Sequence, residues 1–308
     1  MFSWQRNVAT LSLFFSSIIA CQLSSASTPS QEKLTPVEQS YIKFDRLVRD
    51  NSGKADEARQ ASEVYQSVFS VYQSPWKLRS LTLRDVQAVF MAADTVDFYD
   101  PSDRHITDMR LDYAELSRRG AATLDQTSAF YGALFQARKF EEMTAFYTQH
   151  KSAQLPKPPL YFAKADVGQR HVVLDVSSTS NTLTVRGDDI DHGSKILVIS
   201  HPLCHFSQNA MRAIEANAEL RRVFDQNSVW VSPPDRNLDL GPFQEWKKNH
   251  REAPISIALN QASWPEVQIW QTPTFIFLRE GKVVGEVIGW PVEGNVKALD
   301  EEIAKIGL

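Results

Sequence analysis

The residues best suited to chemistry lie where a strand-like segment meets a helix-like segment. Residues 195–199 (KILVI) are apolar and are followed by Ser-His-Pro at 200–202, then by Cys204, two residues, Ser207 and a segment with helical spacing. A cysteine at the first turn of a helix lies among unpaired backbone N–H groups and near the positive end of the helix dipole, which favours its thiolate. The spacing therefore predicts that Cys204 can attack a disulfide and form a mixed disulfide with another chain.

Ser207 stands three residues after Cys204, where a second thiol would complete a redox pair. A serine hydroxyl cannot form a disulfide, so release of a captured substrate would need an outside thiol: glutathione, the substrate's own second thiol or another oxidoreductase. His205, when protonated, would further favour the thiolate of Cys204. The alternative left open is that Cys204 is an inert thiol, as buried single cysteines commonly are.

The other cysteine, Cys21, lies in an amino-terminal segment that reads as an export signal. Arg6 is the only early charge, and residues 8–20 are apolar or small over a stretch too short to span a bilayer comfortably. Residues 18–21 (IIAC) resemble a bacterial lipobox, which implies a signal peptide over 1–21, a lipid on Cys21 and a flexible tether over 22–34. Ordinary cleavage after Ala26 is the alternative. Either route predicts an exported periplasmic protein, tethered to the membrane in the first case, with no internal disulfide.

Composition bounds the number of domains and the kind of partner. The chain has 308 residues, 43% of them hydrophobic, with a formal net charge of −4 and no basic cluster. This length allows two domains, and the charge pattern gives no nucleic-acid-binding face. Residues 35–152 carry apolar residues at helical spacing, such as Val37, Tyr41, Phe44 and Val48, and predict an all-α region in which 131–150 resembles one tetratricopeptide-type hairpin. Prolines at 156, 158 and 159 mark a boundary before a second domain over 160–308.

The second domain alternates strands and helices. A hairpin is predicted from 171–176 and 182–185, followed by strands at 195–199, 228–231, 274–278 and 282–288. Helices are predicted at about 205–217 and 243–250, with a helical turn near 265–270 and a final helix that carries an apolar stripe. This order predicts an α/β layer structure.

The order of these elements, with C-x-x-S after the first strand and Thr272-Pro273 before the strand at 274–278, resembles the thioredoxin fold. The resemblance covers 195–308 and reaches back to about 160 if the hairpin belongs to the domain. It implies a cis Thr272–Pro273 bond facing Cys204, with Thr272, Pro273 and Trp290 as substrate contacts. The chain departs from thioredoxin at Val198, where the family has a buried acid, and at residues 203–207 (LCHFS), which replace the Trp-Cys-Gly-Pro-Cys signature.

These observations leave two classes of function open. The first is monothiol exchange or capture of a protein thiol or disulfide through Cys204, tuned by Ser207 and His205, with an external reductant and no cofactor. The second is an interaction module in which Cys204 is incidental, because a fold does not dictate a function. A metal site at His192, His201 and His205 is less favoured, since their spacing matches no ligand pattern. A Ser207 hydrolase is disfavoured too, and Trp264, Trp270 and Trp290 are read as packing residues or as a substrate-facing rim.

Overall fold

The computed structural model describes residues 33–51, 54, 56–163 and 170–308, of which Thr35–Leu308 form one compact unit. The predicted signal peptide, Cys21 and most of the tether lie outside the described residues, so export and lipidation stay predictions. Within the described part of the chain, no helix combines the length and the apolar character needed to cross a bilayer.

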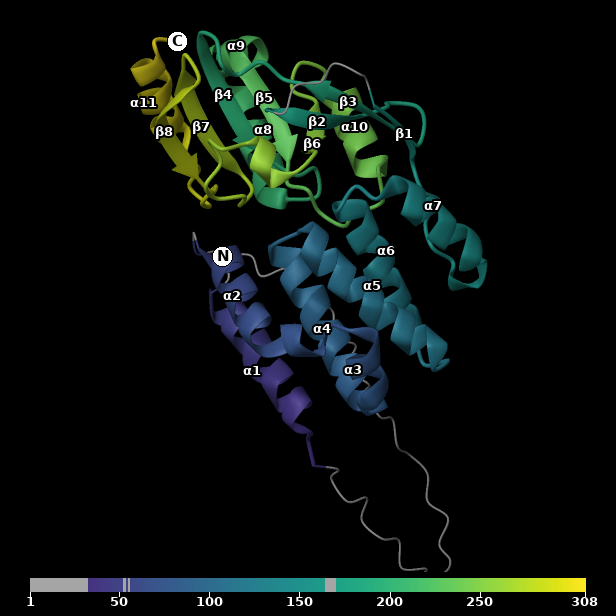
Figure 1. The fold of residues 1–308 in the computed structure, drawn as a ribbon. Helices are drawn as coiled ribbons and strands as arrows, with labels where there is room; N and C mark the ends of the chain where they lie inside the picture. The colour runs from purple at the N-terminus through teal and green to yellow at the C-terminus, as the bar shows by residue number, and fades with distance from the viewer. Residues whose placement is uncertain (1–32, 52–53, 55, 164–169) are drawn as a thin grey trace, which may run out of the picture. The chain divides into compact units, whose positions relative to one another are not determined.

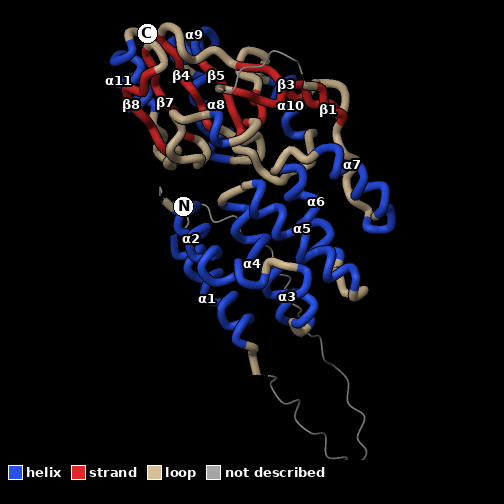
Figure 2. The backbone as a smooth tube through the Cα atoms, in the orientation of Figure 1, coloured by secondary structure: helices blue, strands red, loops and turns tan. Residues whose placement is uncertain are grey.

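The amino-terminal half of the compact unit is helical, as the sequence predicted (Figures 1 and 2). The helices are α1 (Pro36–Asn51), α2 (Glu57–Phe69), η1 (Ser70–Tyr72), α3 (Pro75–Ser80), α4 (Leu83–Tyr99), α5 (Asp103–Arg118), α6 (Leu124–Gln136), α7 (Phe140–Gln149) and η2 (Lys151–Ala153). The expected apolar stripes face inward, and Phe44, Tyr65 and Phe90 are completely or almost completely buried. We call residues 36–153 the helical region.

Helices α6 and α7 form the hairpin expected over 131–150. Arg138 adopts a left-handed φ of 58° directly after α6, which reverses the chain at the break seen in the sequence. Its guanidinium donates to two backbone carbonyls beyond the helical region, those of Ala258 at 2.7 Å and Leu259 at 3.0 Å. The hairpin is therefore tied to the sheet as well as to its neighbouring helices.

The start of α6 is held by a capping box. The Thr123 hydroxyl accepts from the Gln126 backbone N–H at 3.2 Å, and the Gln126 side chain accepts from the Thr123 N–H at 3.0 Å. Removing an N-cap hydroxyl usually lowers stability by about 1 kcal/mol. We expect Thr123→Ala to lower the free energy of unfolding by about 1 kcal/mol, measured by urea unfolding, and Thr123→Ser to keep most of it. Equal losses in both variants would contradict the capping role.

The carboxyl-terminal half forms one mixed sheet of eight strands (Figure 1). The strands are β1 (Leu160–Phe162), β2 (Val172–Val176), β3 (Thr182–Gly187), β4 (Ser194–Ile199), β5 (Ser228–Ser232), β6 (Ile255–Ala258), β7 (Thr274–Arg279) and β8 (Lys282–Ile288), in the order β1-β3-β2-β6-β5-β4-β7-β8. The central strands β4, β5 and β6 are parallel. Strand β7 pairs antiparallel with β4 and places Thr274 opposite Ile199, so the residues before β7 lie beside the residues after β4.

The two faces of the sheet are covered differently. Side chains such as Ile196 and Val198 pack under α8 (His205–Ala216), α9 (Ala218–Asn227), α10 (Gly241–Asn249) and α11 (Val296–Ile306), in a core that continues into the helical region. Side chains on the other face, such as Leu197 and Ile199, pack under Ile190, Trp264 and Val267 from two connecting segments. The alternation along β4 is the period of two expected of a strand with both faces buried.

Several elements differ from the sequence predictions. Helix α3, helix α9 and strands β1 and β6 were not predicted, because each is short or merges with an apolar neighbour. The helical turn predicted near 265–270 is wrong: the turn is η3 (Gln261–Ser263), and Asn260 caps it by accepting from the Ser263 N–H at 2.8 Å. Pro265 follows Trp264, the C-cap residue of that turn.

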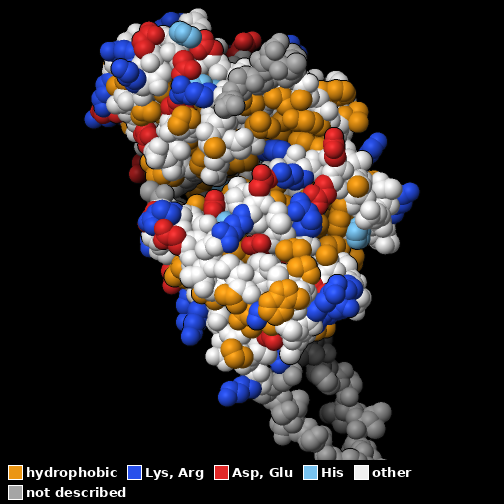
Figure 3. Space-filling view, in the orientation of Figure 1, with side chains coloured by type: hydrophobic (Ala, Val, Ile, Leu, Met, Phe, Trp, Pro, Cys, Tyr) orange, Lys and Arg blue, Asp and Glu red, His pale blue; other side chains and the backbone are white. Residues whose placement is uncertain are grey.

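Strand β1 leaves an apolar edge on the sheet. Leu160, Tyr161 and Phe162 are all exposed, and Figure 3 shows hydrophobic side chains gathered over the part of the sheet formed by β1 and β3. Tyr161 stacks on Phe140 of α7 with ring centroids 4.3 Å apart. This edge therefore contacts the helical region while keeping apolar surface exposed.

Candidate functional site

Cys204 lies in the segment between the end of β4 and the start of α8. It is the N-cap residue of α8 and is partly exposed, and it forms no disulfide within the described part of the chain. Its N–H donates to the His201 carbonyl at 2.9 Å, which closes the turn between the strand and the helix. The sulfur therefore lies at the amino-terminal end of α8, where it is partly exposed.

The segment directly before β7 contacts Cys204, because β7 lies next to β4 in the sheet. The Thr272–Pro273 bond is cis, and the Cys204 Sγ lies 3.4 Å from the Thr272 carbonyl oxygen, to which the thiol donates. The Pro273 carbonyl accepts from the Gly289 N–H at 2.8 Å, which brings the segment after β8 to the same place. The structure thus brings Cys204, Thr272 and Pro273 together, as the sequence predicted.

The other predicted site residues lie around this centre in different environments. Ser207 is completely buried, and its Oγ has no hydrogen-bond partner among the described residues. His205 is exposed on α8, with its ring centroid 4.0 Å from that of Phe206. Trp290 follows Gly289 but is 6% exposed and packs against Phe275, so its ring belongs to the core.

The two residues that flank the thiol in the sequence, Leu203 and His205, are both exposed. Leu203, directly before Cys204, is 52% exposed, and Val292, in the segment after Trp290, is fully exposed. Trp264 is only 1% exposed and Trp270 is partly buried. Both pack in the core on the sheet face that carries Leu197 and Ile199. Trp264 and Trp290 are therefore packing residues, whereas Leu203 and Val292 are exposed.

His201, considered in the sequence only as a metal ligand, organises the turn before Cys204. Its buried imidazole accepts from the Leu203 N–H through Nδ1 at 3.1 Å, while Nε2 lies 3.0 Å from Oδ2 of Asp235. Because Nδ1 must offer a lone pair to the Leu203 N–H, Nε2 carries the ring proton, and its contact with the Asp235 carboxylate is electrostatic. His201 therefore links the turn to residues 233–240, a segment to which the sequence assigned no role.

Arg236, next to Asp235, enters the helical region. Its guanidinium pairs with Asp94 and with Asp97, the latter at 2.9 Å, and its Nε donates to Gln136 at 2.8 Å. Burial raises the pKa of Asp97 to about 6, against the lowering effect of Arg236. Acidic residues three apart on an otherwise apolar helix were the available sequence signal, since buried acids need partners.

One group of possible metal ligands occurs among the described residues, and it is not the histidine set considered in the sequence. His171, Asp191 and Glu266 offer ligand atoms within 4.8 Å of one another. The Nε2 of His171 lies 3.1 Å from Glu266 and its Nδ1 lies 3.6 Å from Asp191, while Arg170 also pairs with Glu266. Because the two carboxylates face opposite ring nitrogens and Arg170 balances their charge, the cluster fits an ion network that ties together three connecting segments.

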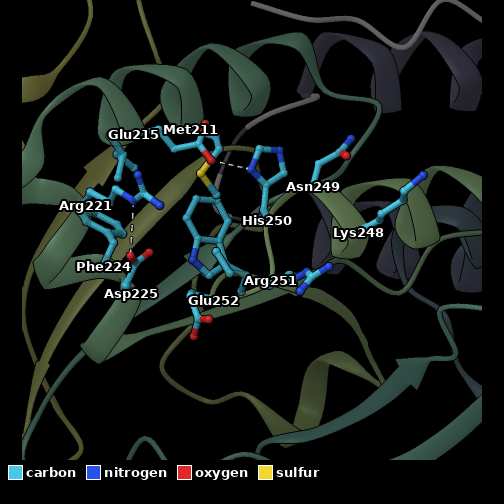
Figure 4. Close-up of a pocket in the computed structure, with 13 residues that line it drawn as sticks. Met211, Glu215, Arg221, Phe224, Asp225, Lys248, Asn249, His250, Arg251 and Glu252 are labelled. Carbon is cyan, nitrogen blue, oxygen red and sulfur yellow. Dashed lines mark hydrogen bonds and ion pairs between the residues drawn. The ribbon is translucent and has the colours of Figure 1, made fainter.

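A surface cavity of about 270 Å³ lies near the far end of α8 (Figure 4). It is lined by Met211, Ile214, Glu215, Arg221, Phe224, Asp225, Trp230 and residues 248–253. His250 pairs with Glu215 at 2.7 Å across it. Met211 and Glu215 lie 7 and 11 residues beyond Cys204, which is about 10 to 16 Å along a helix. The cavity is therefore separate from the thiol site.

A thiol at the start of a helix, facing a carbonyl beside a cis-proline, is the arrangement on which a family assignment would rest. The thiol is flanked by the exposed residues Leu203 and His205, and a buried serine stands at its second position. None of the protein-family models, curated proteins or solved structures compared with this chain matches it.

Proposed function

We propose that residues 160–308 form a thioredoxin-like domain and that the protein performs monothiol thiol–disulfide exchange with a protein substrate through Cys204. The observation that carries this proposal is the position of the sulfur: it is partly exposed at the N-cap of α8, 3.4 Å from the Thr272 carbonyl. Such a thiol is accessible to another chain and lies at the start of a helix, a position that reactive cysteines commonly occupy.

The exchange step needs no electron carrier. The Cys204 thiol gives its proton to solvent, and the thiolate attacks one sulfur of a substrate disulfide. A bond forms between that sulfur and Sγ while the substrate disulfide breaks and its other sulfur leaves as a thiolate. One disulfide replaces another, so the number of oxidised sulfur pairs is unchanged.

Release of the substrate depends on a second thiol. The Ser207 hydroxyl cannot attack the mixed disulfide to form a new disulfide, and its Oγ is buried under α8. An outside thiol, such as glutathione or the substrate's own second cysteine, attacks the substrate sulfur and returns Cys204 to the thiol form. The exposed side chain of Leu203, directly before Cys204, offers an apolar contact to an extended partner segment.

The proposal is tested by trapping the mixed disulfide. The full chain is incubated with oxidised glutathione, and the peptide that contains Cys204 is analysed by mass spectrometry without reductant, which separates it from Cys21. We expect a glutathione adduct on Cys204 that accumulates because no neighbouring thiol resolves it. Cys204→Ser should lose this adduct completely.

Ser207→Cys provides the matched gain-of-function control. A thiol three residues along the same helix would attack the mixed disulfide within the molecule, where effective concentrations are far above those of free thiols. We expect the steady-state adduct to fall by at least about 10-fold, with a disulfide between positions 204 and 207 in its place. An adduct that forms in the urea-unfolded chain but not in the folded one would refute exchange and favour a non-catalytic interaction module.

For the protein as a whole we propose export to the bacterial periplasm, with a lipid on Cys21 as membrane anchor. The support is the apolar segment over residues 8–20, which ends in the lipobox-like IIAC. Replacing Cys21 by Ala while leaving the cleavage site after Ala26 should move the protein from the membrane fraction to the soluble periplasmic fraction. Unchanged membrane association would contradict the anchor.

A further inference from the structure

Residues 233–240, which connect β5 to α10, contact both the helical region and the turn that carries Cys204. Two adjacent side chains make these contacts: Arg236 pairs with α4 and α6, and the Asp235 carboxylate lies 3.0 Å from the His201 ring. The two contacts are separated by one peptide bond. A displacement of one side chain is therefore transmitted to the other through very little intervening chain.

The Arg236 side chain is fully engaged by the helical region. Nη1 pairs with the Asp94 carboxylate, Nη2 donates to the Asp94 carbonyl at 3.1 Å and to Asp97 at 2.9 Å, and Nε donates to Gln136 at 2.8 Å. The guanidinium carbon also lies 5.7 Å from the centroid of the Phe98 ring. A guanidinium held by its planar fork at three nitrogens has a fixed orientation, unlike a surface ion pair.

The backbone around Arg236 is held as closely as its side chain. The Gln136 side chain donates to the Pro234 carbonyl at 3.1 Å. On α6, Gly132 allows the approach, since a Cβ at that position would lie 3.2 Å from the Arg236 Cβ. Prolines 233 and 234 restrict φ in the same segment. The helical region therefore fixes the path of residues 233–236.

Asp235 connects this fixed segment to residues 201–204, the turn that holds the thiol. Its Oδ1 accepts from the Asn237 N–H at 3.0 Å, and its Oδ2 lies 3.0 Å from His201 Nε2. His201 in turn accepts from the Leu203 N–H at 3.1 Å through its ring, and from the Cys204 N–H at 2.9 Å through its carbonyl. The backbone N–H groups of Leu203 and Cys204 are therefore both hydrogen-bonded to His201.

We propose that Arg236 and Asp235 are positioning residues: through them and His201, the helical region sets the place of the Cys204 sulfur at the start of α8. The inference rests on the proposed function in taking Cys204 as the reacting group, and it adds a task for the helical region. Loosening the link moves the sulfur away from the N–H groups of the first helical turn. Because those groups stabilise the thiolate, the thiolate then forms at higher pH.

The test measures the alkylation of Cys204 in the full chain by iodoacetamide as a function of pH, by mass spectrometry of the peptide that carries Cys204. The midpoint of the profile reports thiolate formation, and the plateau rate at high pH reports accessibility. We expect Asp235→Asn to move the midpoint up by about 0.5 pH unit, which lowers the rate about threefold at pH values below both midpoints. Arg236→Gln should shift it in the same direction, and Asp235→Glu should restore most of the wild-type midpoint.

A second readout does not depend on thiol chemistry. Amide hydrogen exchange in residues 203–204 should become faster in Asp235→Asn, because both N–H groups are bonded to His201. The matched control is Asp189→Asn, since Asp189 also contacts a histidine, His192, at 2.9 Å, but on an exposed segment with no bond to the thiol turn. Asp189→Asn should change neither readout.

The double variant Asp235→Asn/Arg236→Gln distinguishes one linked path from two separate effects. Residues that act through one path are not additive, so the double variant should shift the midpoint no further than the larger single variant. A summed shift would overturn the linked path. Wild-type midpoints and wild-type exchange in Asp235→Asn would overturn the proposal even if Arg236→Gln failed to fold. A shifted midpoint without any glutathione adduct would retain the positioning role and remove the exchange activity.

Discussion

Trp264→Ala should lower the free energy of unfolding by about 3–5 kcal/mol, the usual loss for truncating a large buried aromatic side chain. Trp264 is 1% exposed, and its indole N–H donates to the Val172 carbonyl at 3.3 Å. It packs with Val173, Leu197 and Ile276 on the sheet face that only connecting segments cover. The neighbouring side chains are held in the sheet, so the cavity left by the substitution would persist.

The measurement is urea unfolding followed by far-UV circular dichroism, which does not depend on tryptophan emission. Trp76→Ala is the matched control: Trp76 is 66% exposed and contacts Lys77 at 4.6 Å, so we expect a loss of at most about 1 kcal/mol. A similar small loss for Trp264→Ala would mean that the indole is not part of a packed core. Such a result would favour the alternative interpretation of Trp264 as a substrate contact.

Asp97→Asn should abolish a fall in stability between about pH 4 and pH 6 that the wild-type protein shows. Burial raises the pKa of Asp97 from 3.8 to about 6 in the folded chain. Within this range the folded protein retains a proton that the unfolded chain has released. The free energy of unfolding therefore decreases as pH rises, by at most about 3 kcal/mol for a shift of about two pH units.

The physical reason lies in the charge count of the buried cluster. Arg236 supplies one positive charge to two carboxylates, Asp94 and Asp97, and the Oδ1 of Asp97 has no hydrogen-bond partner within the described residues. Ionising Asp97 adds a buried negative charge that Arg236 only partly compensates. An asparagine keeps an acceptor for Arg236 but has no proton to release.

The check is a series of urea unfolding curves from pH 4 to pH 7 for the wild type, Asp97→Asn and Asp97→Ala. The difference between the wild type and Asp97→Asn should change with pH in the predicted direction, because other titrating groups cancel. Asp97→Ala should give the same slope as Asp97→Asn with lower stability throughout, since it also loses the acceptor for Arg236. Parallel curves for all three proteins would show that Asp97 does not titrate in this range.

Much of the fold could be predicted from periodicity alone. The stripe from Val37 to Val48 became α1, and the alternation in 171–176 and 182–185 became β2 and β3, because these segments are long enough for one period to dominate. Strand β6 has only four residues, all buried, and a fully buried strand shows no alternation. Strands β1 and β3 are not adjacent in the chain, and no local sequence pattern reports their pairing.

In the candidate site, too, some residues could be recognised from the sequence and others only from the structure. Cys204, Thr272 and Pro273 were recognised from local motifs, and the structure brings the sulfur to the Thr272 carbonyl. Asp235 and Arg236 carried no local signal, because their partners lie more than 30 residues before Asp235 and 100 or more residues before Arg236.

By itself, the amino-acid sequence determined the helical first half, most strands of the second half, and the place of Cys204 after an apolar strand, because these depend on residue type and short spacing. Only the tertiary structure decided that Trp264 and Trp290 are packing residues, that Ser207 is buried and that Arg236 pairs with Asp94 and Asp97. Burial and charge pairing are properties of surfaces that meet only after the chain folds. They depend on contacts between distant segments, and such contacts leave no periodic trace in the sequence.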